Sequence, residues 1–186
     1  MAKQVYECNW VPSRVTEDQL DDLVPIGALG SKDTIHWRAP GKECPPTPRE
    51  GEVVVFVDHL ARGFKPPGSK FYRDVLADFQ LHPQDTGPNS VTNMCHFQVL
   101  CEAFFQEEPT VELFRDLFHL NRRTEFTDGS NTELGGVAIQ KRKEVTYPHA
   151  KLHSHPKEWS QTCFYCKDTS PASENPFPGF RPERLS

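Results

Sequence analysis

The sequence predicts an α+β fold, a mainly helical single domain with a small C-terminal antiparallel β element. Apolar residues in the densest apolar stretch, 88–120, recur at three- and four-residue steps, the spacing of a buried helix face. After this stretch the period changes, and two short runs, 135–141 and 161–167, have the β-branched and aromatic composition of strands. A length of 186 residues fits one domain with a sizeable core.

The stretch 88–120 is expected to form two helices separated at Pro109, which cannot continue a helical hydrogen-bond ladder. Asn89 or Ser90 can cap the first helix, and Thr110 can cap the second. The apolar residues of the first helix are Val91, Met94, Cys95, Phe97, Leu100, Cys101 and Phe104. They cover more than one face, so we expect this helix to be central and buried on most sides.

The region before the central pair is expected to begin with a short helix capped by Thr16, followed by a Pro- and Gly-rich connector. Together they make up residues 1–47, and we expect the connector to lie over the domain surface. Residues 52–62 contain a β-branched run that could form a strand, but apolar residues at helical spacing before Gly63 favour a helix. Ser69 is expected to cap another helix that runs to Phe79.

Composition limits the classes of function and the location. The net charge is −5, and only residues 121–186 lean basic, at +2, which argues against a protein that binds nucleic acid over its whole surface. No run of 18 apolar residues is present, and the polar start lacks the apolar core of a signal peptide. We therefore expect no membrane contact and an intracellular location, nuclear or cytoplasmic rather than secreted. The six cysteines are expected to be free thiols.

Several short motifs, in order, resemble the plant gypsy-type transposon (transposase) domain family. They include GEVVVF at 51–56, LARGF at 60–64, PGSKF at 67–71, GPNS at 87–90, GGVAIQ at 135–140 and FYCKD at 164–168. The resemblance runs from about residue 48 and implies a domain over 48–168, derived from a retrotransposon, for which no catalytic site can be carried over. We expect the Pro-rich remainder, 169–186, to be a mobile tail.

Residues of the types needed by an aspartic protease and by a metal nuclease are present, but their sequence context does not fit either enzyme. Asp85-Thr86-Gly87 matches the aspartic-protease motif, but His82 and Pro83 precede it where an apolar strand is needed, so a polar turn is expected. A metal nuclease needs converging carboxylates. The candidates Asp58, Asp74, Asp78, Glu102 and Glu112 fall on exposed helix sides, where solvated charge is the ordinary role.

The ligand types for a zinc site occur near the C-terminus, in His153, His155, Cys163 and Cys166, with His149 as an alternative histidine. Only nine residues separate His153 from Cys163, and residues three apart on a strand point to opposite faces. Unlinked core or surface residues are therefore the favoured interpretation. No other cofactor is expected, and structural zinc is the weaker alternative.

A basic cluster is the feature that could contact nucleic acid. It consists of Arg122, Arg123, Lys141, Arg142 and Lys143. Because Glu144 interrupts it, a solvated hairpin face is the simpler interpretation. The leading functional hypothesis is thus a non-enzymatic, transposon-derived domain that acts through a protein partner or through gag-like self-association. A nucleic-acid-associated module of a transposition protein is the alternative, and an enzyme fragment is the weakest.

Overall fold

The computed structural model describes residues 10–121, 137–148, 152 and 158–182. The helices are α1 (Glu17–Asp21), α2 (Lys32–Ile35), α3 (Val57–Leu60), α4 (Lys70–Phe79), α5 (Pro88–Val99) and α6 (Val111–Leu117). Two 3₁₀ turns, η1 (Pro83–Asp85) and η3 (Trp159–Gln161), and a π-helix, η2 (Leu100–Phe105), complete the helical elements. The strands are β1 (Glu52–Phe56), β2 (Phe118–Asn121), β3 (Ala138–Lys141) and β4 (Cys163–Lys167). The α+β class is confirmed, whereas the predominance of helix and the single domain stay predictions.

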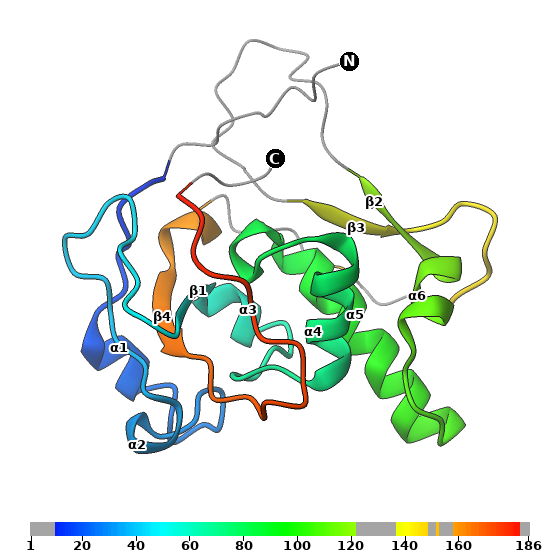
Figure 1. The fold of residues 1–186 in the computed structure, drawn as a ribbon, viewed down its shortest axis with the longest axis horizontal. Helices are drawn as coiled ribbons and strands as arrows, with labels where there is room; N and C mark the ends of the chain where they lie inside the picture. Colours follow the sequence, from blue (N-terminus) through cyan, green and yellow to red (C-terminus); the bar gives the residue numbers. More distant parts are fainter. Residues whose placement is uncertain (1–9, 122–136, 149–151, 153–157, 183–186) are drawn as a thin grey trace, which may run out of the picture.

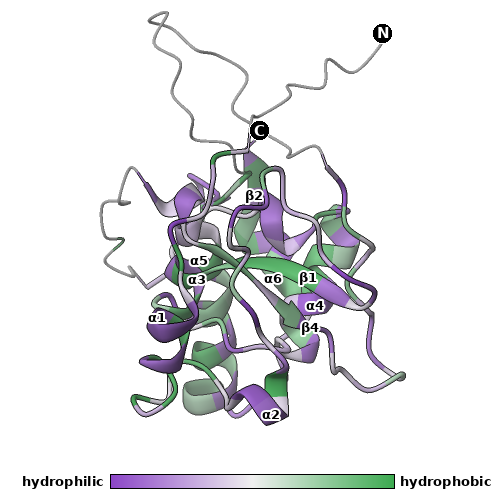
Figure 2. Ribbon diagram, turned by 90° about the vertical axis from the view of Figure 1, so that its left-hand side faces the viewer, coloured by the Kyte–Doolittle hydropathy of each residue, from purple (hydrophilic) through white to green (hydrophobic). Residues whose placement is uncertain are grey.

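Strand β1 forms the centre of the fold by pairing antiparallel with β4, from Glu52 opposite Lys167 to Phe56 opposite Cys163. Figure 2 shows the hydrophobic colour concentrated on β1 in the middle of the molecule. Its side chains alternate between two apolar clusters: Val53 and Val55 belong to the main core, while Val54 and Phe56 pack with Trp159. The helix predicted over 52–62 is therefore wrong for its first half, and only α3 is helical.

The main core is an aromatic stack that joins α4, α5 and α6. Phe97 lies 5.3 Å from Phe71 and 5.2 Å from Phe114 between ring centroids, and Phe114 stacks on Phe118 at 4.5 Å. The predicted caps are present at Ser69 and Thr110, whose side chains accept backbone N–H groups of their helices. Helix α5 instead begins at Pro88, and neither Asn89 nor Ser90 caps it.

The second sheet is the β2–β3 pair, which the buried start of α5 fixes in place. Ser90 Oγ donates to the Val137 carbonyl at 2.8 Å and accepts from the Ile139 amide, and Asn93 Nδ2 donates to the Ile139 carbonyl at 2.8 Å. The predicted antiparallel pairing is present, but the two predicted C-terminal strands belong to different sheets: β3 pairs with β2, and β4 pairs with β1.

The N-terminal part packs along β4 and also supplies Ile35 and Trp37 to the main core, so it is more than the expected connector over the domain surface. Thr16 caps α1 in a capping box with Gln19. Beyond α2, Arg38 forms an isolated bridge with Tyr165 and a salt bridge with Glu52 at 2.8 Å. Figure 1 shows this segment, in blue and cyan, on the side of the molecule that faces away from α6.

The Pro-rich segment after β4 also contacts the body of the protein. Arg73 of α4 forms an ion pair with Asp168 at 2.9 Å and lies over the ring of Phe177 at 4.2 Å. Further along, Arg181 pairs with Asp85, and Gln84 Nε2 donates to the Arg181 carbonyl at 2.7 Å. In Figure 1 this segment, in red, crosses in front of α3 and α4. Up to residue 182 it therefore packs on α4 and η1, and the division into 1–47, 48–168 and 169–186 stays a prediction.

Across the described ranges, no helix has the length and apolar character needed to cross a bilayer.

Candidate protein-interaction surface

The four residues predicted as zinc ligands are not brought together by the described structure. His153 and His155, like the alternative His149, lie outside the described residues. Cys163 packs with Trp159 in the second apolar cluster, whereas Cys166 is buried in the main core on the other face of β4. Burial raises the pKa of the Cys166 thiol to about 12. The two cysteines therefore face different clusters, and the weaker zinc alternative, whose histidines lie outside the described residues, stays a prediction.

The carboxylates considered for catalysis are spread over α3 (Asp58), α4 (Asp74 and Asp78), η2 (Glu102) and α6 (Glu112). Asp58 accepts from Thr162 Oγ1 at 3.0 Å, and Asp78 pairs with Arg115 at 3.3 Å. Asp74 pairs with Lys70 at 2.5 Å. Within the described ranges, no group of three or more His, Cys, Asp or Glu side chains could hold a metal ion.

Asp85 of the protease-like motif lies in a turn, as expected, and this turn is the 3₁₀ element η1. Its carboxylate accepts from the His82 amide at 2.8 Å and pairs with Arg181, and its carbonyl accepts from the Val137 amide at 2.6 Å. Asp85 and Thr86 are fully buried. The motif therefore connects η1 to the segment that leads into β3.

Of the predicted basic cluster, the structure describes Lys141, Arg142 and Lys143, and the first two form hydrogen bonds within the protein. Lys141 Nζ donates to the carbonyls of Arg142 and Val145, and Arg142 Nε donates to the Arg115 carbonyl at 2.9 Å. Lys143 is exposed. Arg122 and Arg123 lie outside the described residues. They follow Asn121, which pairs with Ala138 at one end of the β2–β3 ladder. Lys141 pairs with Phe118 at the other end.

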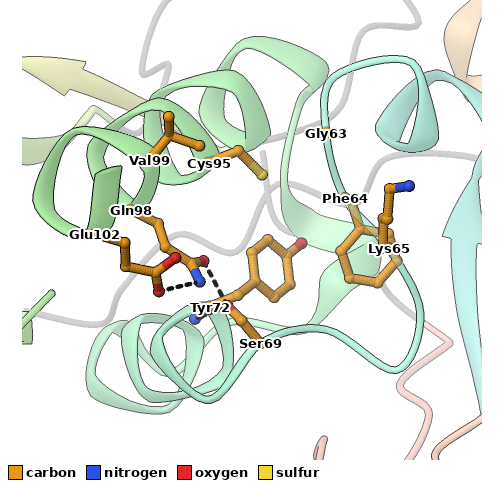
Figure 3. A pocket seen from close by; sticks show the side chains of 9 residues that line it. All are labelled: Gly63, Phe64, Lys65, Ser69, Tyr72, Cys95, Gln98, Val99 and Glu102. Atoms are coloured by element: carbon orange, nitrogen blue, oxygen red, sulfur yellow. Dashed lines mark hydrogen bonds between the residues drawn. The ribbon is translucent and has the colours of Figure 1, made fainter. Parts of the chain in front are cut away.

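A pocket of about 250 Å³ opens between the loop before α4, the start of α4 and the last turn of α5. Figure 3 shows its lining, with the Tyr72 ring and the Cys95 sulfur directed into it. Ser69 Oγ donates to Gln98 Oε1 at 2.7 Å, and Gln98 Nε2 donates to Glu102 Oε1 at 2.8 Å, which forms a polar rim (Figure 3). The remaining lining residues are Gly63, Phe64, Lys65 and Val99.

The Cys95 thiol and the Tyr72 hydroxyl of the pocket wall are held in their neutral forms. Burial raises the pKa of the Cys95 thiol to about 11, so little thiolate is present near neutral pH. Burial is also the main cause of the raised pKa of Tyr72, whose ring forms part of the wall. The Lys65 ammonium donates to the Gly27 carbonyl at 2.9 Å.

Beside the pocket, three apolar side chains are exposed at the end of the α5–η2 helix: Val99 at 51%, Phe104 at 72% and Phe105 at 66%. We call these three residues the aromatic tip. Val99 also lines the pocket, and Phe104 follows it by one π turn, so the tip begins at the pocket wall. Figure 1 shows this helix reaching the edge of the molecule, where the chain turns back into α6. Contiguous apolar surface of this kind marks interaction sites on soluble proteins.

The tip corrects one prediction, because Phe104 was expected in the core. The 3.6-residue repeat that places Phe97 and Cys101 inside would also place Phe104 inside. The π winding from residue 100 widens the turn, and Phe104 leaves the buried face. The Glu102 side chain, two residues before Phe104, accepts a hydrogen bond from Gln98 Nε2. The run Gln-Glu-Glu-Pro after the two phenylalanines signals that the helix ends there, but not that they are exposed.

Comparison with known proteins supports the family resemblance. A family model described as "Putative gypsy type transposon" matches residues 53–122. No curated protein and no solved structure matches the chain. The matched segment contains the whole pocket and the whole aromatic tip, whereas β3 and β4 lie outside it.

Proposed function

We propose that this chain is a non-enzymatic domain, derived from a plant gypsy-type retrotransposon, that acts by binding another protein through the aromatic tip and the adjacent pocket. The exposure of Phe104 and Phe105 next to each other, at the end of a helix that is otherwise anchored in the core, carries this proposal. Aromatic side chains are enriched among the residues that dominate binding energy at protein interfaces.

The anchoring of the tip supports a binding role. Phe97, two turns before Phe104, is buried in the aromatic stack, and Cys101 is buried as well. The helix therefore presents the tip from a rigid base, which lowers the ordering cost that a binding surface must offset. The pocket next to it offers Phe64 and Tyr72 to an apolar side chain of the partner.

The alternative, a module that binds nucleic acid through the β2–β3 hairpin, has less support. Two of its three described cations donate to backbone carbonyls of the protein itself. Phosphate binding requires cations that are free to replace the counterions of the nucleic acid.

The proposal is tested by peptide-display selection on the purified chain, with the library made neutral in net charge so that charge does not bias the outcome. Selected peptides are then titrated against the native chain, the double variant F104S/F105S and the control variant I26S. Ile26 is 73% exposed, does not belong to the tip and does not line the pocket. We expect the F104S/F105S variant to bind at least about tenfold more weakly, because interface aromatics each contribute about 2 kcal/mol or more.

I26S is expected to bind like the native chain. Selected peptides that bind all three proteins equally, or a selection that enriches no peptide, would contradict the proposal.

A further inference from the structure

We infer that the partner segment recognised by the aromatic tip is basic as well as apolar, a peptide stretch in which Lys or Arg side chains flank two or three apolar anchors. This inference rests on the proposed function and names the chemistry of the partner. It is carried by the charges that surround the tip.

The segment from residue 99 to residue 113 carries four carboxylates and no Lys, Arg or His. They belong to Glu102, Glu107, Glu108 and Glu112, all of them exposed. Glu102 stands on the pocket rim, Glu107 and Glu108 follow the tip directly, and Glu112 lies in the first turn of α6. The apolar surface is therefore bordered by negative charge where the chain turns back.

The described cations on the neighbouring helix faces form their ion pairs with other carboxylates, although Lys70 is also attracted to Glu108 at longer range. Lys70 of α4 forms a 2.5 Å pair with Asp74, and Arg115 of α6 forms a 3.3 Å pair with Asp78. Lys65, which lines the pocket, directs its ammonium to the Gly27 carbonyl. Within the part of the chain that the structure describes, none of the four carboxylates forms a salt bridge. A partner that supplies Lys or Arg beside its apolar anchors would complement them, and charge complementarity of this kind raises the association rate and selects the partner.

The same charges weigh against two other occupants. In a symmetric contact between two copies, the tips would bring together four carboxylates from each copy, and like charges across an interface are unfavourable. Nucleic acid would place its phosphates beside the same carboxylates. A separate protein segment with positive charge fits both the apolar and the charged part of this surface.

The test uses three fluorescently labelled peptides of about 18 residues, which is five helical turns. They share Leu and Phe at helical spacing and carry Lys, Gln or Glu at all other positions. Each is titrated by fluorescence anisotropy into the native chain, F104S/F105S and E107Q/E108Q, at low and at moderate salt. The matched control is D21N/D22N, which removes two adjacent exposed carboxylates from the end of α1.

We expect the Lys peptide to bind the native chain at least about tenfold more tightly than the Gln peptide at low salt, and the Glu peptide not to bind. The E107Q/E108Q variant should bind the Lys peptide several-fold more weakly and with a smaller salt dependence, while D21N/D22N should bind it like the native chain.

Equal weakening by E107Q/E108Q and D21N/D22N would overturn the inference, because it would reveal general attraction between opposite charges. Tight, Phe104-dependent binding of the Gln peptide would overturn it too, and would leave the proposed function standing. A dimer of the native chain, detected by light scattering and abolished in F104S/F105S, would also overturn the inference. It would show that the tip binds a second copy of this chain. The neutral display selection tests the proposed function independently, so the two failures are distinguishable.

Discussion

The guanidinium of Arg73 lies 2.9 Å from a carboxylate oxygen of Asp168, and the arginine side chain is fully buried. The two residues belong to α4 and to the segment after β4. The Arg73 guanidinium also lies over the ring of Phe177, whose backbone amide donates to Asp168 at 3.0 Å. This pair fixes the Pro-rich C-terminal segment against the core.

Replacing Arg73 by Met should destabilise the protein by about 3–5 kcal/mol, because Asp168 would lose the partner of a buried ion pair. The control is Lys70→Met, which removes a mostly exposed pair with Asp74 and should cost less than about 1 kcal/mol. Urea denaturation measures both free energies of unfolding. Equal, small losses in the two variants would show that the segment after β4 contributes little to stability.

Acid should destabilise the native chain partly through Asp168. Burial acts to raise the pKa of its carboxyl, but hydrogen bonds from Arg73, Ser170 and the Phe177 amide hold it below the usual value. The carboxylate therefore contributes stability above the pKa of an unfolded aspartate, about 3.9, and this stability is lost as the pH falls through the lower folded value.

Thermal unfolding midpoints measured between neutral pH and pH 2 test this dependence. The D168N variant should be less stable at neutral pH and should lose less stability than the native chain on acidification. Parallel curves for the two proteins would contradict the assignment.

Gly63→Ala should be more destabilising than Gly41→Ala. Both glycines have positive φ, 98° and 64°, but a Cβ on Gly63 would meet the Cys95 Cβ at 3.2 Å, whereas nothing lies within 4 Å of one on Gly41. Backbone strain alone should cost about 1 kcal/mol or more in each variant, and the crowding at Cys95 should add to it at Gly63. Urea denaturation gives the comparison. A larger loss in G41A would contradict the close approach of α3 and α5 at this point.

Substitutions of Phe97 in α5 and Phe104 in η2 should have different effects on the free energy of unfolding. Phe97→Ala is expected to cost about 3–5 kcal/mol, because it opens a cavity in the aromatic stack. Phe104→Ala should leave the free energy of unfolding within about 0.5 kcal/mol of the native value, since the side chain is exposed. A comparable loss in both variants would mean that the tip is packed and would remove the basis of the proposed interface.

Alkylation of the native protein should distinguish the cysteines. Cys44 is exposed, whereas Cys163 and Cys166 are buried on opposite faces of β4. We expect iodoacetamide to modify Cys44 first and to reach Cys163 and Cys166 only on unfolding, because reaction needs an accessible thiolate. Mass spectrometry of the peptides reads out each site. Early modification of Cys166 would contradict its place in the core.

Helix starts could be predicted where the signal is local. Thr16, Ser69 and Thr110 cap their helices as expected, since a capping hydrogen bond reaches only two or three residues along the chain. Strand β1 could not be predicted in this way. Val53 and Phe56 fit both a helix and a strand, and the choice depends on β4, which follows more than a hundred residues later.

The surface was harder to predict than the core. The same repeat that correctly places Phe97 and Cys101 inside places Phe104 inside as well, because the change to π winding at residue 100 leaves no clear mark in the sequence. The pocket depends on the packing of α4 against α5, which local patterns do not specify. Strand periodicity did predict that Cys163 and Cys166 would point to opposite faces, and they pack in different apolar clusters.

The pairing of β1 with β4 has a consequence for the segment 53–122 that matches the family model. A polypeptide cut to that length would keep the tip and the pocket residues but would lose the hydrogen-bonding neighbours of both β1 and β2. Val54 and Phe56 would be uncovered, and two open strand edges would be available to other chains. Such a fragment should precipitate or form β-rich aggregates, so the unit defined by sequence similarity is smaller than the unit that can fold.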